Sequence, residues 1–134
     1  MKKDEALIGN EQIEKSIKEL KEEFTDENLS VVLTVIRKRA VENGQFVVAV
    51  DATSGMDSLS LKTANFNGKK WFVAYTSFEE EMKGQLNVVS GFLADIAKLL
   101  EMVAGSSEVE GIILNPYGNM ITLNKQIIEV IRGT

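Results

Sequence analysis

Asn67 and Gly68 lie between two short apolar segments near the middle of the 134-residue chain. Before them, apolar and polar residues alternate over residues 59–63, and after them residues 71–75 form an apolar run. An Asn-Gly pair in this position is the strongest local signal for a two-residue hairpin turn, because both residues adopt positive φ there. The sequence therefore predicts an antiparallel hairpin over residues 59–75, and the rest of the fold has to be built around a sheet.

Helical and extended patterns alternate on both sides of this hairpin. Apolar residues spaced by three and four predict helices, and short apolar runs closed by turn residues predict strands. The expected order is helix 10–24, helix 25–43, strand 46–50, strands 59–63 and 71–75, helix 77–84, helix 90–105, strand 109–114, strand 120–123 and helix 126–131. Such an order is typical of one α/β or α+β layer packing rather than of a repeat array.

Helix caps add detail to these boundaries. Asn10 is expected to cap the first helix. The segment Thr76-Ser77-Phe78-Glu79 fits a capping box, and Ser77 with Glu80 is the alternative register. A short helix is therefore expected directly after the strand at residues 71–75.

Composition excludes several classes of function. The chain has no cysteine and no histidine, so disulfides, thiolate nucleophiles, Cys-based metal sites and histidine proton shuttles are excluded. A net charge of -5 argues against broad binding to nucleic acid or to anionic membranes. Two N-terminal lysines are followed by Asp4 and Glu5, so no signal peptide is expected, and no apolar stretch is long enough to span a membrane. A cytoplasmic protein without a cofactor is the resulting expectation.

Two blocks of sequence resemble the N-terminal domain of the SseB family, named after a serine-sensitivity phenotype. The first is Trp71-Phe72-Val73-Ala74-Tyr75-Thr76-Ser77 followed by an acidic helix, and the second is Val109-Glu110-Gly111-Ile112-Ile113-Leu114-Asn115-Pro116. The family pattern has a Phe where this chain has Tyr75. The resemblance implies one domain over residues 1–134, an α/β (α+β) fold with a mixed β-sheet, a β-hairpin and packed helices, and no established catalytic residues. The matching positions are Thr76, Ser77, Asn115, Pro116 and Gly118.

The stretch after the strand at residues 46–50 is the most enzyme-like part of the sequence. Asp51, Thr53 and Ser54 place a carboxylate and two hydroxyls where several α/β folds hold a divalent cation or a phosphate, and Asp57 and Ser58 could add oxygen ligands. A surface loop that joins two strands explains the same residues. The metal-or-phosphate enzyme is thus an alternative, and no metal ligand is assigned.

A second candidate site is a polar pocket at the ends of two strands. Thr76 and Ser77 follow one strand, and Asn115 and Tyr117 follow another. Ligands of α/β sheets bind at such strand ends, so these side chains are candidates for binding a ligand or partner. The same residues also serve as helix caps and turn formers.

The remaining conspicuous residues have structural explanations. Residues 79–81, three glutamates, are expected to be the solvated first turn of a helix, and residues 37–39, Arg-Lys-Arg, a solvated last turn. Trp71 and Tyr75 share one face of their strand and are expected in the core, with a binding rim that includes Tyr117 as the alternative.

The leading hypothesis from sequence is a non-enzymatic cytoplasmic interaction module of the SseB type. A protein partner or self-association would be its function, with no nucleic acid and no membrane involved. The rival hypotheses are an enzyme centred on Asp51 and an adaptor that adds a partner strand to a sheet edge.

Overall fold

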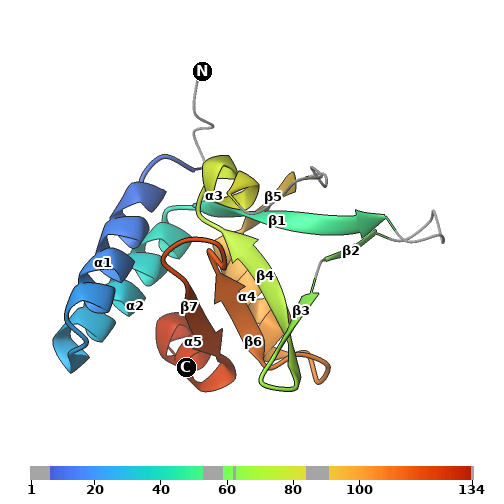
Figure 1. Ribbon diagram of the computed structural model, residues 1–134. Coiled ribbons are helices and arrows are strands. Elements are labelled where there is room, and N and C mark those ends of the chain that lie inside the picture. Colours follow the sequence, from blue (N-terminus) through green and yellow to red (C-terminus); the bar gives the residue numbers. More distant parts are fainter. Residues whose placement is uncertain (1–6, 53–58, 62, 84–90, 134) are drawn as a thin grey trace.

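The computed structural model describes residues 7–52, 59–61, 63–83 and 91–133. The elements, in chain order, are α1(Asn10–Glu22), α2(Asp26–Val41), β1(Gln45–Ala52), β2(Leu59–Leu61), β3(Thr63–Phe66), β4(Lys69–Tyr75), α3(Phe78–Met82), β5(Gly91–Asp95), α4(Ile96–Ala104), β6(Gly111–Leu114), β7(Ile121–Asn124) and α5(Lys125–Arg132) (Figure 1). This arrangement confirms the expected α/β fold with a mixed sheet.

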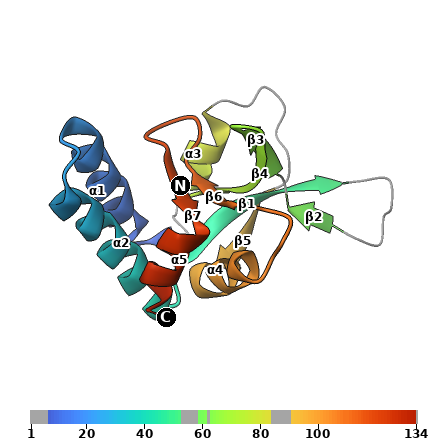
Figure 2. The same cartoon turned by 90° about the horizontal axis from the view of Figure 1, so that it is seen from below.

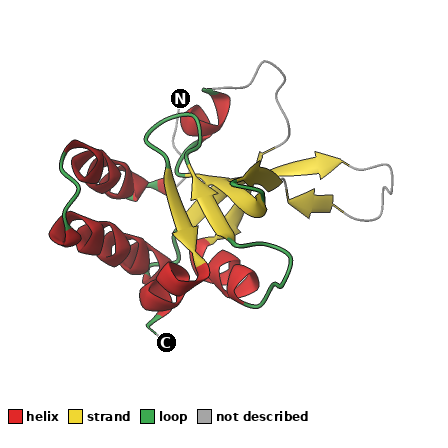
Figure 3. Cartoon of the chain, turned by 60° about the horizontal axis from the view of Figure 1, so that its bottom comes forward, coloured by secondary structure: helices red, strands yellow, loops and turns green. Residues whose placement is uncertain are grey.

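Strand β4 is the centre of the sheet, whose order is β2-β1-β4-β6-β7. It pairs antiparallel with β1 and β3 and parallel with β6. Figure 3 shows the strands of the sheet in yellow. Strand β1 also pairs with β5, so it has neighbours on both sides, as the continuous apolar run at residues 46–50 predicts. The parallel pair places the ends of β4 and β6 at the same edge of the sheet, and this edge carries the polar site described below.

The predicted hairpin is present as β3 and β4. Asn67 and Gly68 have φ angles of 55° and 75°, the positive values that a two-residue turn of this kind needs. The predicted strand at residues 59–63 is divided into β2, which pairs with β1, and β3, which pairs with β4. One continuous strand over residues 59–63 was therefore a wrong prediction, because the two halves have different neighbours.

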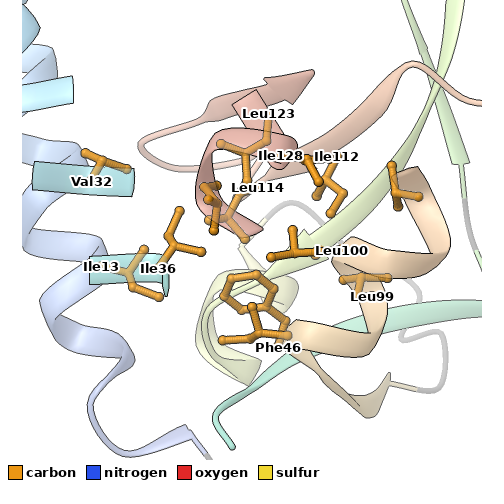
Figure 4. Packing of buried hydrophobic residues seen from close by; sticks show 14 of the residues in the cluster. Ile13, Val32, Ile36, Phe46, Leu99, Leu100, Ile112, Leu114, Leu123 and Ile128 are labelled. Atoms are coloured by element: carbon orange, nitrogen blue, oxygen red, sulfur yellow. The ribbon is translucent and has the colours of Figure 1, made fainter. Parts of the chain in front are cut away.

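Four helices cover one face of the sheet and enclose the main core. Figure 2 shows α1, α2, α4 and α5 gathered on this side of the sheet. Their side chains meet those of the sheet, as Figure 4 shows, and the buried cluster includes Ile13, Val32, Ile36, Phe46, Leu99, Leu100, Ile112, Leu114, Leu123 and Ile128. Burying side chains of this size contributes about 1.5–3 kcal/mol each before entropy is counted. Within the described ranges, no helix is both long and apolar enough to cross a bilayer.

A smaller cluster occupies the opposite face. Leu7, Val47, Val73 and Tyr75 are buried there, and Tyr75 is fully buried. Trp71 is also buried, and its indole Nε1 donates a hydrogen bond to the Phe66 carbonyl at 3.2 Å. Trp71 and Tyr75 are thus core, as expected.

The helix expected to begin at residue 90 or 91 begins later. Residues 91–95 form β5, which pairs antiparallel with β1 from Gln45–Asp95 to Ala49–Gly91, and α4 starts only at Ile96. The apolar spacing at Leu93 and Ile96 fits a helix stripe, but the free edge of β1 provides backbone hydrogen bonds that extend the strand.

Candidate functional site

Thr76 and Asn115 lie side by side at the edge of the sheet where β4 and β6 end. The Thr76 backbone N–H donates to Asn115 Oδ1 at 2.9 Å, and Asn115 Nδ2 donates to Thr76 Oγ1 at 3.1 Å. Both residues are buried, with exposed fractions of 0% and 2%. The sequence prediction that these two side chains meet is therefore confirmed.

The backbone of Asn115 explains its orientation. Its φ of 54° lies in the left-handed region, which Asn tolerates better than most residues. Its N–H donates to the Ala74 carbonyl at 2.9 Å, and its carbonyl accepts from Gly118 N–H at 3.1 Å. The turn after β6 thus directs the Asn115 amide back toward the end of β4.

Asn10 and Arg39 extend this cluster to the helices. Asn10 Nδ2 donates to the carbonyls of Gln45 at 2.8 Å and Thr76 at 3.0 Å, and Arg39 Nε donates to Asn10 Oδ1 at 3.0 Å. The expected cap at Asn10 was wrong: Gly9 is the cap residue, and Asn10 is the first residue of α1, 1% exposed. A single amide therefore links α1, α2, β1 and the end of β4.

Arg39 also corrects the expectation of a solvated last turn. It is 7% exposed, whereas Arg37 and Lys38 are exposed. Its guanidinium contacts Glu42 Oε1 at 3.3 Å in addition to Asn10. Arg39 lies three residues after the buried Ile36, on the inner face of α2, and this spacing was the signal in the sequence that could have identified it.

Glu14 of α1 completes the chain of hydrogen bonds. Thr76 Oγ1 accepts from Asn115 and donates to the Glu14 carboxylate. Asn10, Glu14, Arg39, Thr76 and Asn115, which we call the polar network, are thus bonded to one another and to backbone groups. Such buried groups stabilise a fold when each has a partner.

Ser77 and Tyr117 lie next to the polar network. Ser77 Oγ accepts from Glu80 N–H at 3.2 Å and caps α3, so the alternative capping register is the observed one. Tyr117 is 43% exposed and stacks on Tyr75 with ring centroids 6.2 Å apart. These predicted binding residues lie together, but the side chain of Ser77 is used in the cap.

Asp51 lies away from this edge. Because β1 runs antiparallel to β4, with Val47 opposite Tyr75 and Val48 opposite Ala74, the chain at Asp51 has moved toward the start of β4. Its backbone pairs with Ser60 in β2. Thr53 and Ser54 lie outside the described residues, and so do Asp57 and Ser58. A shared pocket of Asp51 with the polar network is excluded by this register.

The three glutamates of α3 differ from one another in exposure. Glu79 is exposed, Glu80 forms an ion pair with Lys83 at 2.6 Å, and Glu81 is only 5% exposed. The expectation of a fully solvated turn is wrong for Glu81, which is a buried residue of this short helix. In the described part of the chain, no three acidic side chains gather in a way that could hold a metal ion.

Two adjoining hollows lie on the outer surface of the helical layer. One, of about 260 Å³, lies between α2 and α5, and the other, of about 360 Å³, lies between α2, α4 and α5. Arg37 and Ile131 line both hollows, so the two meet there. We call the two together the helical groove. No local pattern in the sequence predicts this site, because its residues come from three helices, two of which are far from α2 in the chain.

One continuous face of α2 forms a wall of the helical groove. The residues recur at intervals of three and four along the whole helix, namely Asp26, Leu29, Ser30, Leu33, Thr34, Arg37, Ala40 and Val41. Val130 of α5 and Val41 are apolar side chains with exposed fractions of 59% and 77%. A long groove with exposed apolar side chains is typical of sites that bind another protein segment.

The dual role of Asn115, as turn residue and hydrogen-bonding partner, can be tested. Asn115→Gly keeps the left-handed backbone and loses the bonds to Thr76, so we expect the free energy of unfolding to fall by about 1.5 kcal/mol. Asn115→Ala adds the strain of a left-handed alanine, about 1 kcal/mol more. Urea denaturation followed by the fluorescence of Trp71, the only tryptophan, measures both. Equal losses for the two variants would contradict the backbone part of this explanation.

Comparisons with protein-family models, with curated proteins and with solved structures found no match to this chain.

Proposed function

We propose that this chain is a non-enzymatic interaction module of the SseB type, which acts in the cytoplasm by binding a protein segment in the helical groove. The observation that carries the proposal is the groove itself, which follows the full length of α2, contains both apolar and polar side chains of that helix, and has exposed valines on α2 and α5. An exposed apolar strip of this kind lowers the free energy of association when a partner covers it.

The polar network supports the same conclusion. Its side chains at the strand ends, where α/β folds commonly bind ligands, form hydrogen bonds with one another and with backbone carbonyls. A ligand at this edge would have to displace those bonds. The absence of cysteine from the sequence is compatible with a reducing compartment such as the cytoplasm.

Site-specific photo-crosslinking tests the module directly. A benzophenone amino acid at Val130, which lines the groove, is expected to give defined adducts with one partner protein or with a second copy in cells that express the chain. Val31 is the matched control, because it is an exposed valine of α2 that lines neither hollow. Equal adduct patterns from the two positions, or none from Val130, would refute the proposal.

The enzyme centred on Asp51 makes a different prediction. Calorimetric titration with Mg²⁺, Ca²⁺ and inorganic phosphate is expected to give no binding heat if the chain is only an interaction module. Binding that is present in the wild type and lost in Asp51→Ala would favour the enzyme instead.

A further inference from the structure

We infer that the helical groove binds an amphipathic helix that carries carboxylates, and that Arg37 and Arg132 recognise these charges. This inference rests on the proposed function and adds the chemistry of the partner. It follows from the length of the groove, from the apolar residues along it and from the position of the two guanidiniums.

The length and shape of the groove fit a helix. The wall formed by α2 extends over 16 residues, which at 1.5 Å per residue is about 24 Å. Leu29 and Leu33 lie along its first half, and Ala40 and Val41 along its second. Figure 2 shows α5 between α2 and α4 on this side of the molecule. A helix of four to five turns with one apolar face has the dimensions to lie along α2.

Two arginine side chains line the larger hollow at the end of α5. A Cβ built on Gly133 would be 2.9 Å from Arg37 Nη2, so the Arg37 guanidinium lies against the residue that follows Arg132. Both arginines are exposed, and both line the larger hollow. Within the described residues neither forms an ion pair, although Glu101 lines the same hollow.

These two arginines outnumber Glu101 in the larger hollow, whose lining has a formal charge of +1, opposite in sign to that of the whole chain, whereas Asp26 and Arg37 balance each other in the smaller hollow. The net charge is -5, so a partner attracted by overall charge would be basic. In the larger hollow, however, the guanidiniums of Arg37 and Arg132 favour carboxylates, which they bind with two parallel hydrogen bonds. The carboxylates of the partner helix are therefore placed beside Arg37 and Arg132, and its apolar face lies over Val41 and Val130.

A charge-swap experiment tests this inference. The probes are two fluorescein-labelled helical peptides of 18 residues with the same leucine face, one flanked by glutamates and the other by lysines. We expect the wild type to bind the glutamate peptide about tenfold more tightly in fluorescence anisotropy. The double variant R37E/R132E is expected to reverse this preference. Circular dichroism checks that the variant is folded.

The matched control is the double variant K38E/K70E, which changes the net charge by the same amount. Lys38 is exposed and adjacent to Arg37 in sequence but lines neither hollow, and Lys70 lies on β4. This variant should keep the preference for the glutamate peptide. Equal binding of the two peptides by the wild type, absence of binding, or loss of preference in the control would each overturn the inference. Adducts from Val130 with a partner of different chemistry would leave the interaction module in place and refute only the acidic helix.

If the occupant is a second copy of the chain, sedimentation shows a different result. The wild type would then be dimeric and R37E/R132E monomeric, without any added peptide. That outcome would overturn the partner helix proposed here.

Discussion

Asn10→Ala is expected to lower the free energy of unfolding by about 3 to 4 kcal/mol. The substitution removes two hydrogen bonds to the carbonyls of Gln45 and Thr76 and the acceptor of Arg39 Nε. Each buried group left without a partner costs about 1–3 kcal/mol, and the Thr76 carbonyl and Arg39 are both buried. Urea denaturation monitored by Trp71 fluorescence measures the loss.

Two further variants test whether this loss of stability comes from the hydrogen bonds of the Asn10 amide or from any substitution in α1. Asn10→Asp keeps an oxygen for Arg39 but replaces the donor with a second oxygen beside two carbonyls, so we expect a loss of about 2 kcal/mol. Gln12→Ala is the control, since Gln12 carries an amide on the exposed side of α1, and its effect should stay within about 0.5 kcal/mol. An Asn10→Ala loss no larger than that of the control would show that the polar network does not stabilise the fold.

Gly111→Ala is expected to destabilise the protein by at least about 3 kcal/mol. A Cβ at this position would lie 2.0 Å from the Leu123 carbonyl oxygen and 2.9 Å from Asn124 Cα, both backbone atoms of the neighbouring strand. Gly111 pairs directly with Asn124, whose side chain caps α5 by accepting from Ile127 N–H at 2.8 Å. The added methyl group therefore displaces β7 together with the start of α5.

Gly105→Ala provides the matched comparison for this prediction. A Cβ there would lie 3.7 Å from its nearest neighbour, the Glu101 carbonyl oxygen, which is ordinary contact. Its φ of -89° suits alanine, so stability should change by less than about 1 kcal/mol. Thermal denaturation of both variants distinguishes crowding at β7 from a general effect of replacing glycine, and similar midpoints for the two would contradict the crowding.

Local patterns predicted most of the elements. Asn67–Gly68 specified the hairpin, and apolar spacing specified α1, α2 and α5 within a few residues. Thr25 is the cap of α2, and its hydroxyl accepts from Asn28 N–H at 3.0 Å. Each of these features depends on residues only a few positions apart, so one sequence contains the whole signal.

Features that depend on distant partners were missed. The pairing of β5 with β1 joins residues about 50 positions apart, and nothing in the local spacing around Leu93 distinguishes this strand from a helix turn. Asn10 bonds to Thr76, 66 positions away, and Arg39 to Asn10, 29 positions away. The meeting of Thr76 and Asn115 was predictable, because both follow strands that were expected to end at one edge. The helical groove was not, because it depends on how α2, α4 and α5 pack.

The hydrogen bonds of Asn10 to residues far along the chain also bear on the order in which the protein folds. Helix α1 is synthesised before β1 and β4, yet the carbonyls that hold its first residue belong to residues 45 and 76. Closing so long a loop carries an entropic cost that is offset only once β1 and β4 are already paired. We therefore expect the hydrogen bonds of Asn10 to form late in folding, whereas the apolar side of α1 can pack earlier against α2, the next helix in the chain.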